Sequence, residues 1–130
     1  MTDSNKVLVQ RALAGLIQTG DVGALATFLT GDFRHHRPGG LTLSRTEWLA
    51  AVEAALAPLA GMRVEIEQLL AEGDHVVVFS RRWLPDGGPE ITVVDRWRIQ
   101  DGLIAEGWEL IEPTAEVTMH LAWWTVAPVR

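Results

Sequence analysis

Residues 91–113 read ITVVDRWRIQDGLIAEGWELIEP and predict two antiparallel strands joined by a tight turn. Apolar and polar residues alternate over 91–100, Asp101-Gly102 is a strong signal for a two-residue hairpin loop, and residues 103–111 return as the second strand. Side chains alternate between the two faces of a strand, so one face of the first strand is apolar except for Asp95. A carboxylate in the middle of a buried face makes Asp95 the first candidate for chemistry.

The two-residue loop also predicts which residues of the two strands face each other. With this register Trp97 meets Glu106, and Asp95 meets Trp108. The inner face of the hairpin then carries two carboxylates, Asp95 and Glu106, flanked by two indole rings. We therefore expect Glu106 to be a second carboxylate of the same site.

The rest of the chain predicts helices first and strands afterwards. Apolar residues at helical spacing predict helices over 4–19 and 22–29, and the capping box Ser44-Arg45-Thr46-Glu47 predicts a third helix to about residue 59. Residues 32–40 predict a short extended piece and a loop, because proline and two glycines follow one another there. Three helices followed by four strands predict one α+β domain over residues 1–130, with helices covering one face of an antiparallel sheet.

A second predicted hairpin supplies further candidates for the inner face. The turn at Gly73-Asp74 joins a strand that starts near residue 62 to a strand over 75–83. Its register places Phe79, Arg81 and Trp83 on one face. The apolar residues of 117–130 fit either another strand or a lid.

Composition excludes several classes of function. The 130-residue chain is 48% hydrophobic with a formal net charge of −6 and has no cysteine, which argues against nucleic-acid or membrane partners and against cysteine-bound metals. No histidine and carboxylate spacing is typical of a metal site, and no glycine-rich phosphate loop is present. We expect neither metal nor cofactor. The polar N-terminal residues lack the apolar segment of a signal peptide, so we expect a cytoplasmic location.

The order of these motifs resembles the SnoaL-like family of the nuclear-transport-factor-2-like superfamily. Its late hairpin reads roughly Asp-x-Phe-Arg-x-x-Asp-Gly-Lys-Ile-x-Glu-His-Trp-Asp-x-Ile-x-Pro, and residues 95–113 follow the same frame. Upstream, 36–38 (His-Arg-Pro) and 73–78 (Gly-Asp-His-Val-Val-Val) resemble two further motifs of one branch. Two residues depart from the pattern, since Gly107 replaces the histidine and Glu109 replaces the following aspartate. In the predicted register both lie on the outer face.

The resemblance implies a cone-shaped, curved antiparallel sheet wrapped around an apolar pocket and closed by the three N-terminal helices. Family members include polyketide cyclases that act by aldol condensation, isomerases, epoxide hydrolases, dehydratases and proteins without activity. An acidic pocket residue serves as the acid/base in the cyclases, and Asp95 matches it. Members usually form homodimers through the other face of the sheet, which we expect here at Val76, Val78, Val94 and Ile111.

Each catalytic candidate also has a structural explanation. An apolar surround raises the pKa of a carboxyl such as Asp95 toward neutrality, where it can exchange protons with carbon beside a carbonyl. Alternatively Asp95 is a structural residue bonded to an indole or to Arg81. His36, or its neighbour His35, is either an acid/base at the pocket mouth or a turn cap. Glu106 is either catalytic or bonded to the indole of Trp97.

The aromatic residues are candidates for substrate binding or for plain core packing. The predicted substrate-binding residues share the inner face or the pocket mouth and are Phe79, Arg81, Trp83, Trp97, Trp108 and His35. The leading hypothesis is a cofactor-independent enzyme for a hydrophobic, polyketide-like or polycyclic carbonyl compound, which cyclises, isomerises or dehydrates its substrate. The alternatives are an epoxide hydrolase or hydratase, and a binding or scaffold module without catalysis.

Overall fold

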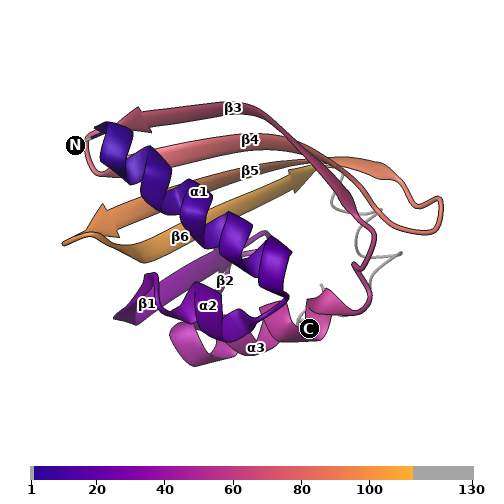
Figure 1. Cartoon of the computed structure of the whole chain (residues 1–130), viewed down its shortest axis with the longest axis horizontal. Coiled ribbons are helices and arrows are strands. Elements are labelled where there is room, and N and C mark those ends of the chain that lie inside the picture. The colour runs from indigo at the N-terminus through magenta and orange to yellow at the C-terminus, as the bar shows by residue number, and fades with distance from the viewer. Residues whose placement is uncertain (1, 113–130) are drawn as a thin grey trace.

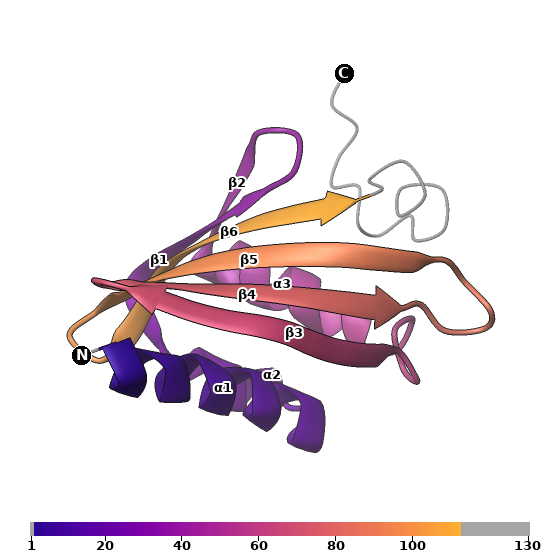
Figure 2. The same cartoon turned by 90° about the horizontal axis from the view of Figure 1, so that it is seen from above.

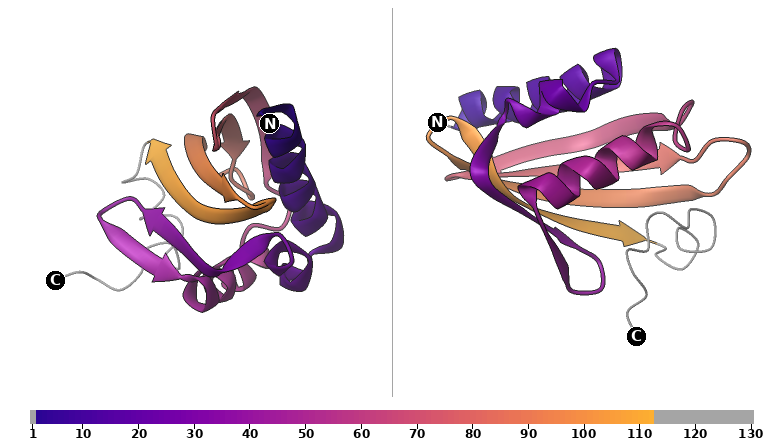
Figure 3. Two further views of the ribbon diagram at one scale, coloured as in Figure 1. Left: turned by 90° about the vertical axis from the view of Figure 1, so that its left-hand side faces the viewer. Right: turned by 90° about the horizontal axis from the view of Figure 1, so that it is seen from below.

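The computed structural model of the chain describes residues 2–112, which form a curved six-stranded sheet with helices along one side (Figures 1 to 3). The elements in chain order are α1 (Thr2–Thr19), α2 (Val22–Ala26), β1 (Leu29–Arg37), β2 (Leu41–Ser44), α3 (Arg45–Leu56), β3 (Arg63–Glu72), β4 (His75–Trp83), β5 (Glu90–Gln100) and β6 (Leu103–Glu112). The strand order in the sheet is β2-β1-β6-β5-β4-β3. The α+β class predicted from the sequence is therefore correct.

The predicted start signals of the second and third helices are present. Asp21 accepts a hydrogen bond from the Gly23 N–H at 2.8 Å and caps α2. At α3 the Ser44 N–H donates to Glu47 Oε1 at 2.9 Å, and the Glu47 N–H donates back to Ser44 Oγ at 3.2 Å. This reciprocal pair confirms the predicted capping box.

The predicted order of three helices followed by four strands is wrong. A hairpin of β1 and β2 stands between α2 and α3, where we expected a loop with a short extended piece. In β1 the buried residues Phe33, His35 and Arg37 alternate with more exposed ones, which is strand periodicity carried by polar side chains. Because β1 runs parallel to β6, the sheet is mixed and not purely antiparallel.

The turn between β5 and β6 is as predicted, but the register beyond it is not. Asp101 and Gly102 both have positive φ, at 53° and 78°, and Ile99 faces Ile104 as expected. A β-bulge then adds one residue to β6, and Ile104 and Ala105 are both buried. From there on Arg98 faces Glu106 and Asp95 faces Glu109.

This bulge exchanges the two faces of β6. The predicted inward placement of Glu106 and Trp108 is wrong, because a shift of one residue turns every following side chain to the other face. Gly107, Glu109 and Ile111 point inward instead, and all three are buried.

A second bulge between Ile66 and Gln68 in β3 has the same effect on the β3–β4 hairpin. The pairs Leu70–Val77 and Glu72–His75 keep the expected register, but Ile66 faces Ser80. The inward residues of β4 are Val76, Val78, Ser80 and Arg82. The predicted inward placement of Phe79, Arg81 and Trp83 is therefore wrong, and these three lie on the outer face.

The helices and the inner face of the sheet bury two apolar clusters. The larger contains residues of α1, β1 and α3 packed on β4, β5 and β6, among them Val9, Phe33, Trp48, Val78 and Trp97. The smaller joins Leu84, Ile91, Val93 and Ile111 to Leu59 and Met62 after α3. The cavity described below lies along both clusters.

The exposed apolar residues on the outer face of the sheet differ from those predicted to form the dimer contact. Val76, Val78 and Ile111 are buried on the inner face, so the predicted contact surface is wrong for these three. Leu110 is 66% exposed and lies in one row with Val94 and Phe79. The homodimer itself stays a prediction, which light scattering would test, and this row is the surface it would use.

Among residues 2–112, no helix is long and apolar enough to cross a membrane. The C-terminal segment for which a strand and a lid were both considered lies outside the described residues.

Candidate functional site

A cavity of about 590 Å³ lies between the helices and the inner face of the sheet. Its walls are mostly aliphatic and come from α1, α3, β3 and β4. Polar side chains of the sheet also line it, namely His35, Arg37, Ser80, Arg82, Asp95 and Glu109. This volume, with an apolar wall and a few grouped polar residues, is typical of a site for a small organic molecule.

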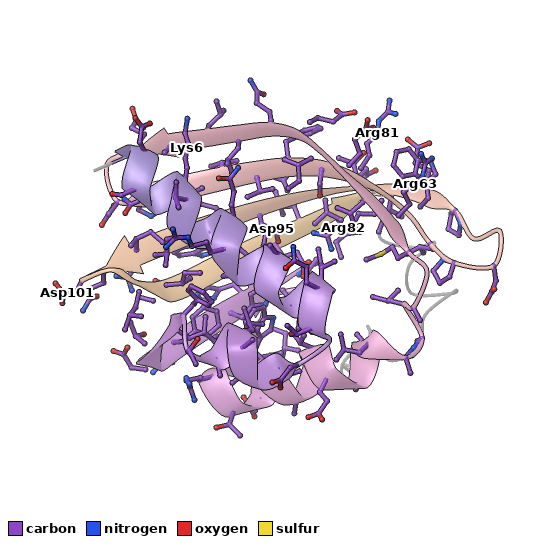
Figure 4. All side chains as sticks on the ribbon, in the orientation of Figure 1. Lys6, Arg63, Arg81, Arg82, Asp95 and Asp101 are labelled. Carbon is purple, nitrogen blue, oxygen red and sulfur yellow. The ribbon has the colours of Figure 1, made fainter. Side chains whose placement is uncertain are left out.

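Two carboxylates form the centre of the polar group. Asp95 on β5 and Glu109 on β6 are directly opposite each other in the sheet, and their residues are 3% and 7% exposed. Arg82 on β4 donates to Asp95 Oδ2 at 3.3 Å and to Ser80 Oγ at 3.3 Å. Figure 4 shows Asp95 and Arg82 next to each other on the strands that α1 covers.

The surroundings of the two carboxylates separate their protonation states. Burial raises the pKa of Asp95 from 3.8 to about 6, and the charge of Arg82 opposes the rise. Burial and then the neighbouring charge of Asp95 raise the pKa of Glu109 from 4.5 to about 8, against the opposing charges of Arg82 and Arg37. Near neutral pH the pair therefore contains one ionised carboxylate, at Asp95, and one protonated carboxylic acid, at Glu109. Two carboxyls with separated pKa values are the arrangement of a base beside an acid.

Aromatic rings form one end of the cavity. The His35 ring stacks on Trp48 with centroids 4.9 Å apart, and Trp97 lies 5.9 Å from His35 and 6.0 Å from Trp48. Burial, followed by the charges of Arg37 and His36, lowers the pKa of His35 to about 3. His35 is therefore a neutral ring at physiological pH. His35 and Trp97 both line the cavity, and their role in substrate binding stays a prediction.

Gly107 makes room for the indole of Trp97. A Cβ atom at Gly107 would lie 2.3 Å from Cζ3 and 2.6 Å from Cε3 of Trp97, closer than unbonded atoms approach. The residue that departs from the family pattern thus lies on the inner face and lets Trp97 rest on β6.

We expect Gly107→Ala to destabilise the protein by about 1–3 kcal/mol, because the added methyl group forces Trp97 out of its position. Urea unfolding monitored by fluorescence measures this loss. Gly31→Ala is the matched control, since a Cβ at Gly31 in β1 meets no atom within 4 Å. Equal stability of the two variants would contradict the proposed contact.

His36 and Glu106 come together, but on the outer face. His36 Nε2 lies 2.6 Å from Glu106 Oε2, Nδ1 of the same ring lies 2.9 Å from Thr42 Oγ1, and Arg98 Nε donates to Glu106 Oε1 at 3.1 Å. The His36 ring also stacks on Trp108 at 5.1 Å. None of these residues lines the cavity. The predicted position of Glu106 at the pocket is wrong because the β6 bulge turns its side chain outward. The predicted position of His36 is wrong because it follows the inward-facing His35 along β1 and so points to the other face.

The other predicted substrate-binding residues also lie away from the cavity. Arg81 pairs with Glu67 at 3.0 Å and with Glu90 at 3.5 Å, so the alternative that it holds Asp95 is wrong. Trp83 is covered by the guanidinium of Arg63, 3.9 Å from the ring centroid.

Sequence reasoning missed Glu109 and Arg82 as cavity residues. One signal for Glu109 was available, because a glycine inside a strand, here Gly107, often marks a bulge or a close approach of another group. Arg82 shares its face with Val76 and Val78 in the regular strand β4, and it was missed because the predicted register with β3 ignored the bulge in that strand. In the described part of the chain, no three histidine, aspartate or glutamate residues gather in a way that would hold a metal ion.

Solved structures share this fold along nearly the whole chain. A candidate SnoaL-like polyketide cyclase from Jannaschia sp. CCS1 has a TM-score of 0.78 at 20% identity, covering 98% of this chain and 96% of its own. AclR, a candidate hydroxylase from Streptomyces galilaeus, has a TM-score of 0.76 at 18% identity, covering 92% and 97%. IdmH, a candidate polyketide cyclase from Streptomyces antibioticus, has a TM-score of 0.67 at 23% identity, covering 85% and 96%.

At these identities the structural matches establish the fold alone. Among curated proteins, no sequence matches this chain. The model of the SnoaL-like domain family matches residues 9–107, which include α3, all of β5 and most residues of the cavity wall. The chain therefore belongs to the SnoaL-like domain family.

Proposed function

We propose that the protein is an acid/base enzyme for an apolar, polycyclic or polyketide-like carbonyl compound. The observation that supports this most directly is the facing pair of Asp95 and Glu109 in the wall of a largely apolar cavity. The polyketide cyclases among the structural relatives support the same substrate class. Both proton carriers of the reaction are side chains of the chain itself, so the proposed chemistry requires no cofactor.

In the proposed reaction Asp95 is the base and Glu109 the acid. The ionised carboxylate of Asp95 takes a proton from the carbon beside the carbonyl, and the electron pair of that C–H bond forms the C=C bond of an enol. The protonated carboxyl of Glu109 gives its proton to the carbonyl oxygen. Reprotonation at another carbon isomerises the compound, attack on a second carbonyl closes a ring, and loss of a hydroxyl group dehydrates it.

Arg82 fixes which carboxyl is the base. Its guanidinium contacts Asp95 directly at 3.3 Å, and an adjacent positive charge favours the ionised form of a carboxyl. Glu109 Oε1 is buried and has no hydrogen-bond partner among the described residues.

Epoxide hydration is a second candidate, favoured by the presence of a protonated acid beside a base. In that reaction Asp95 takes a proton from water, the resulting hydroxide attacks an epoxide carbon, and Glu109 protonates the oxygen that leaves that carbon. The product is a diol. The third candidate is a binding module without catalysis, which holds its ligand in the same cavity and leaves it chemically unchanged.

Two bicyclic probes of similar size separate these candidates. We expect the protein to accelerate exchange of the protons next to the carbonyl of 2-tetralone in D2O, followed by NMR, because that exchange requires the same proton abstraction. Indene oxide tests hydration, with the diol and its 18O content measured in 18O-labelled water. Diol formation without ketone exchange would favour the second candidate. The absence of both reactions would favour the binding module.

A further inference from the structure

The residues that line the cavity become more exposed from one end of it to the other. At the aromatic end Trp48 and Trp97 are buried. The lining residues that are exposed come from the end of α1, the connection between α3 and β3, and β3, and they are Ile17, Gly20, Ala60, Gly61 and Ile66. A residue that borders a cavity and is also open to solvent marks the opening of that cavity. We call these five residues the mouth.

The mouth is apolar and can be reached from solvent. Ile17 is 69% exposed and Ile66 is 46% exposed, and the other three residues have no side chain larger than a methyl group. Figure 1 shows that α1 ends on the side of the molecule where the chain passes from α3 to β3. Leu13 and Val64, which are partly buried, continue the apolar surface from the mouth into the cavity. An apolar group that enters here is therefore removed from water together with the side chains that it touches.

The mouth is well separated from the carboxyl pair. Ile66 pairs with Ser80 of β4, and Asp95 of β5 pairs with Val78, so Ile66 and Asp95 are two strands and two rows of the sheet apart. Neighbouring strands lie about 4.8 Å apart and each residue adds about 3.4 Å along a strand, which separates the two backbone positions by roughly 12 Å. A ligand that contacts both residues therefore has to be elongated, with its reacting carbonyl in the cavity and another group at the mouth.

We propose that the mouth is a subsite for an apolar extension of the substrate, and that Ile17 and Ile66 determine the preference for it. Exposed apolar side chains are ordinary when they are scattered singly. These two border one opening and are continuous with the apolar wall of the cavity. The inference rests on the proposed function for where the carbonyl is held. It adds that the substrate carries an alkyl or ring extension at the end far from that carbonyl.

A series of 4-alkylbenzophenones tests the subsite, because its members differ only in the length of an apolar chain. Each methylene group that is buried raises the affinity about fourfold, so we expect wild-type protein to bind the propyl compound roughly 10 times more tightly than the methyl compound. Quenching of tryptophan fluorescence measures both affinities. Ile66→Thr keeps a β-branched side chain in the strand, and Ile17→Gln keeps a good helix former. We expect each variant to bind the methyl compound like wild type and to lower the preference for the propyl compound to roughly threefold or less.

Leu70→Thr and Val7→Gln are the matched controls. Leu70 lies on the outer face of β3 and is 51% exposed, and Val7 lies in α1 and is 43% exposed, but neither residue lines the cavity. Both controls should keep the wild-type preference for the propyl compound. An unchanged preference in both Ile17→Gln and Ile66→Thr would overturn the subsite, and so would an equal loss of preference in the controls.

NMR of the bound propyl compound gives a reading without any variant. The terminal methyl group of the chain should show nuclear Overhauser contacts to the Cδ1 methyl group of Ile17 or Ile66. Leu25 and Ile104 also line the cavity, but they are buried. Contacts to these two residues instead would place the chain away from the mouth and overturn the proposal.

Benzophenones have no hydrogen on the carbons beside the carbonyl and cannot form an enol. Their binding therefore reports on recognition separately from proton transfer. A propyl preference that depends on Ile17 and Ile66, without exchange of 2-tetralone, would reject the proposed catalysis and leave the subsite standing. Exchange of 2-tetralone with the same preference in Ile66→Thr and Leu70→Thr would reject the subsite alone.

Discussion

Asp95→Asn is expected to reduce the exchange of 2-tetralone by roughly 10²–10⁴-fold, the range over which a positioned general base contributes. The amide has nearly the shape of the carboxylate but cannot accept a proton at neutral pH. Its oxygen can still accept the hydrogen bond that Arg82 donates at 3.3 Å, so the cavity keeps its geometry. We therefore expect the melting temperature to stay at or above that of wild type, because the ionised Asp95 carboxylate costs folding free energy.

Asp74→Asn is the control for removal of one aspartate charge. Asp74 lies in the turn between β3 and β4, where it pairs with His75 at 2.9 Å, away from the cavity. This variant should keep full exchange activity. If Asp95→Asn unfolds the protein, Asp95 is a structural residue, and if it keeps full activity, another group is the base.

The pH dependence of Asp95 catalysis follows from the raised pKa. Asp95 acts as a base only when ionised, so exchange should increase as pH rises through about 6. Glu109 acts as an acid only when protonated, so exchange should decrease as pH rises through about 8. The two limbs together give a bell-shaped profile.

The class of fold was accessible from the sequence because its signals are local. The capping box at Ser44 and Glu47, the turn at Asp101-Gly102 and the alternation over β5 each depend on a few neighbouring residues. Asp95 was accessible for the same reason, since a single carboxylate interrupts an apolar face of period two. The hairpin of β1 and β2 was not, because its inward residues include His35 and Arg37, which do not read as an apolar face.

The composition of the site was harder to predict because two bulges decide it. One extra residue in β6 replaces Glu106 and Trp108 by Gly107 and Glu109 on the inner face. No strong sequence signal marks the extra residue itself, Ala105. Strand periodicity carries an error of one residue to every later position, so a single missed bulge inverts the site.

Histidines 35 and 36 illustrate the same limit on a smaller scale. Adjacent residues of a strand point to opposite faces, so one of the two had to face the cavity. Which one does so is set by the pairing of β1 with the bulged strand β6, a contact between segments about 70 residues apart. Sequence spacing alone cannot supply that information.

Burial of the carboxyl pair separates the two pKa values and lowers the free energy of unfolding. Desolvation raises the pKa values of Asp95 and Glu109, which means that their ionised forms are less stable in the folded protein than in the unfolded chain. Perturbed pKa values of this kind cluster at functional sites. The free energy of unfolding should therefore increase when one of the two carboxyls is replaced by a neutral group.

Glu109→Gln is expected to stabilise the protein at alkaline pH while it lowers exchange activity. The pKa of Glu109 is about 8 in the folded protein against 4.5 as its ordinary value, so the folded state binds more protons between these limits. Wild-type stability must then fall as pH rises from about 5 to 9, because ionisation favours the unfolded chain. With about 1.4 kcal/mol for each pKa unit, the gain of the variant at pH 9 is on the order of 2–5 kcal/mol. At pH 5 the two proteins should have similar stability.

Glu106→Gln is the matched control, three residues away on the same strand and on the opposite face, and its effect should have the opposite sign. Burial opposes ionisation of Glu106, but hydrogen bonds from His36 and Arg98 outweigh it and hold the pKa below its ordinary value. Ionised Glu106 therefore stabilises the fold above the pKa of the unfolded chain, and that contribution is lost as pH falls. Urea unfolding from pH 5 to 9 should show Glu109→Gln above wild type and Glu106→Gln below it at the alkaline end. Loss of stability in both variants at pH 9 would mean that Glu109 is ionised and paired, and that the acid of the proposed reaction has to be sought elsewhere in the cavity.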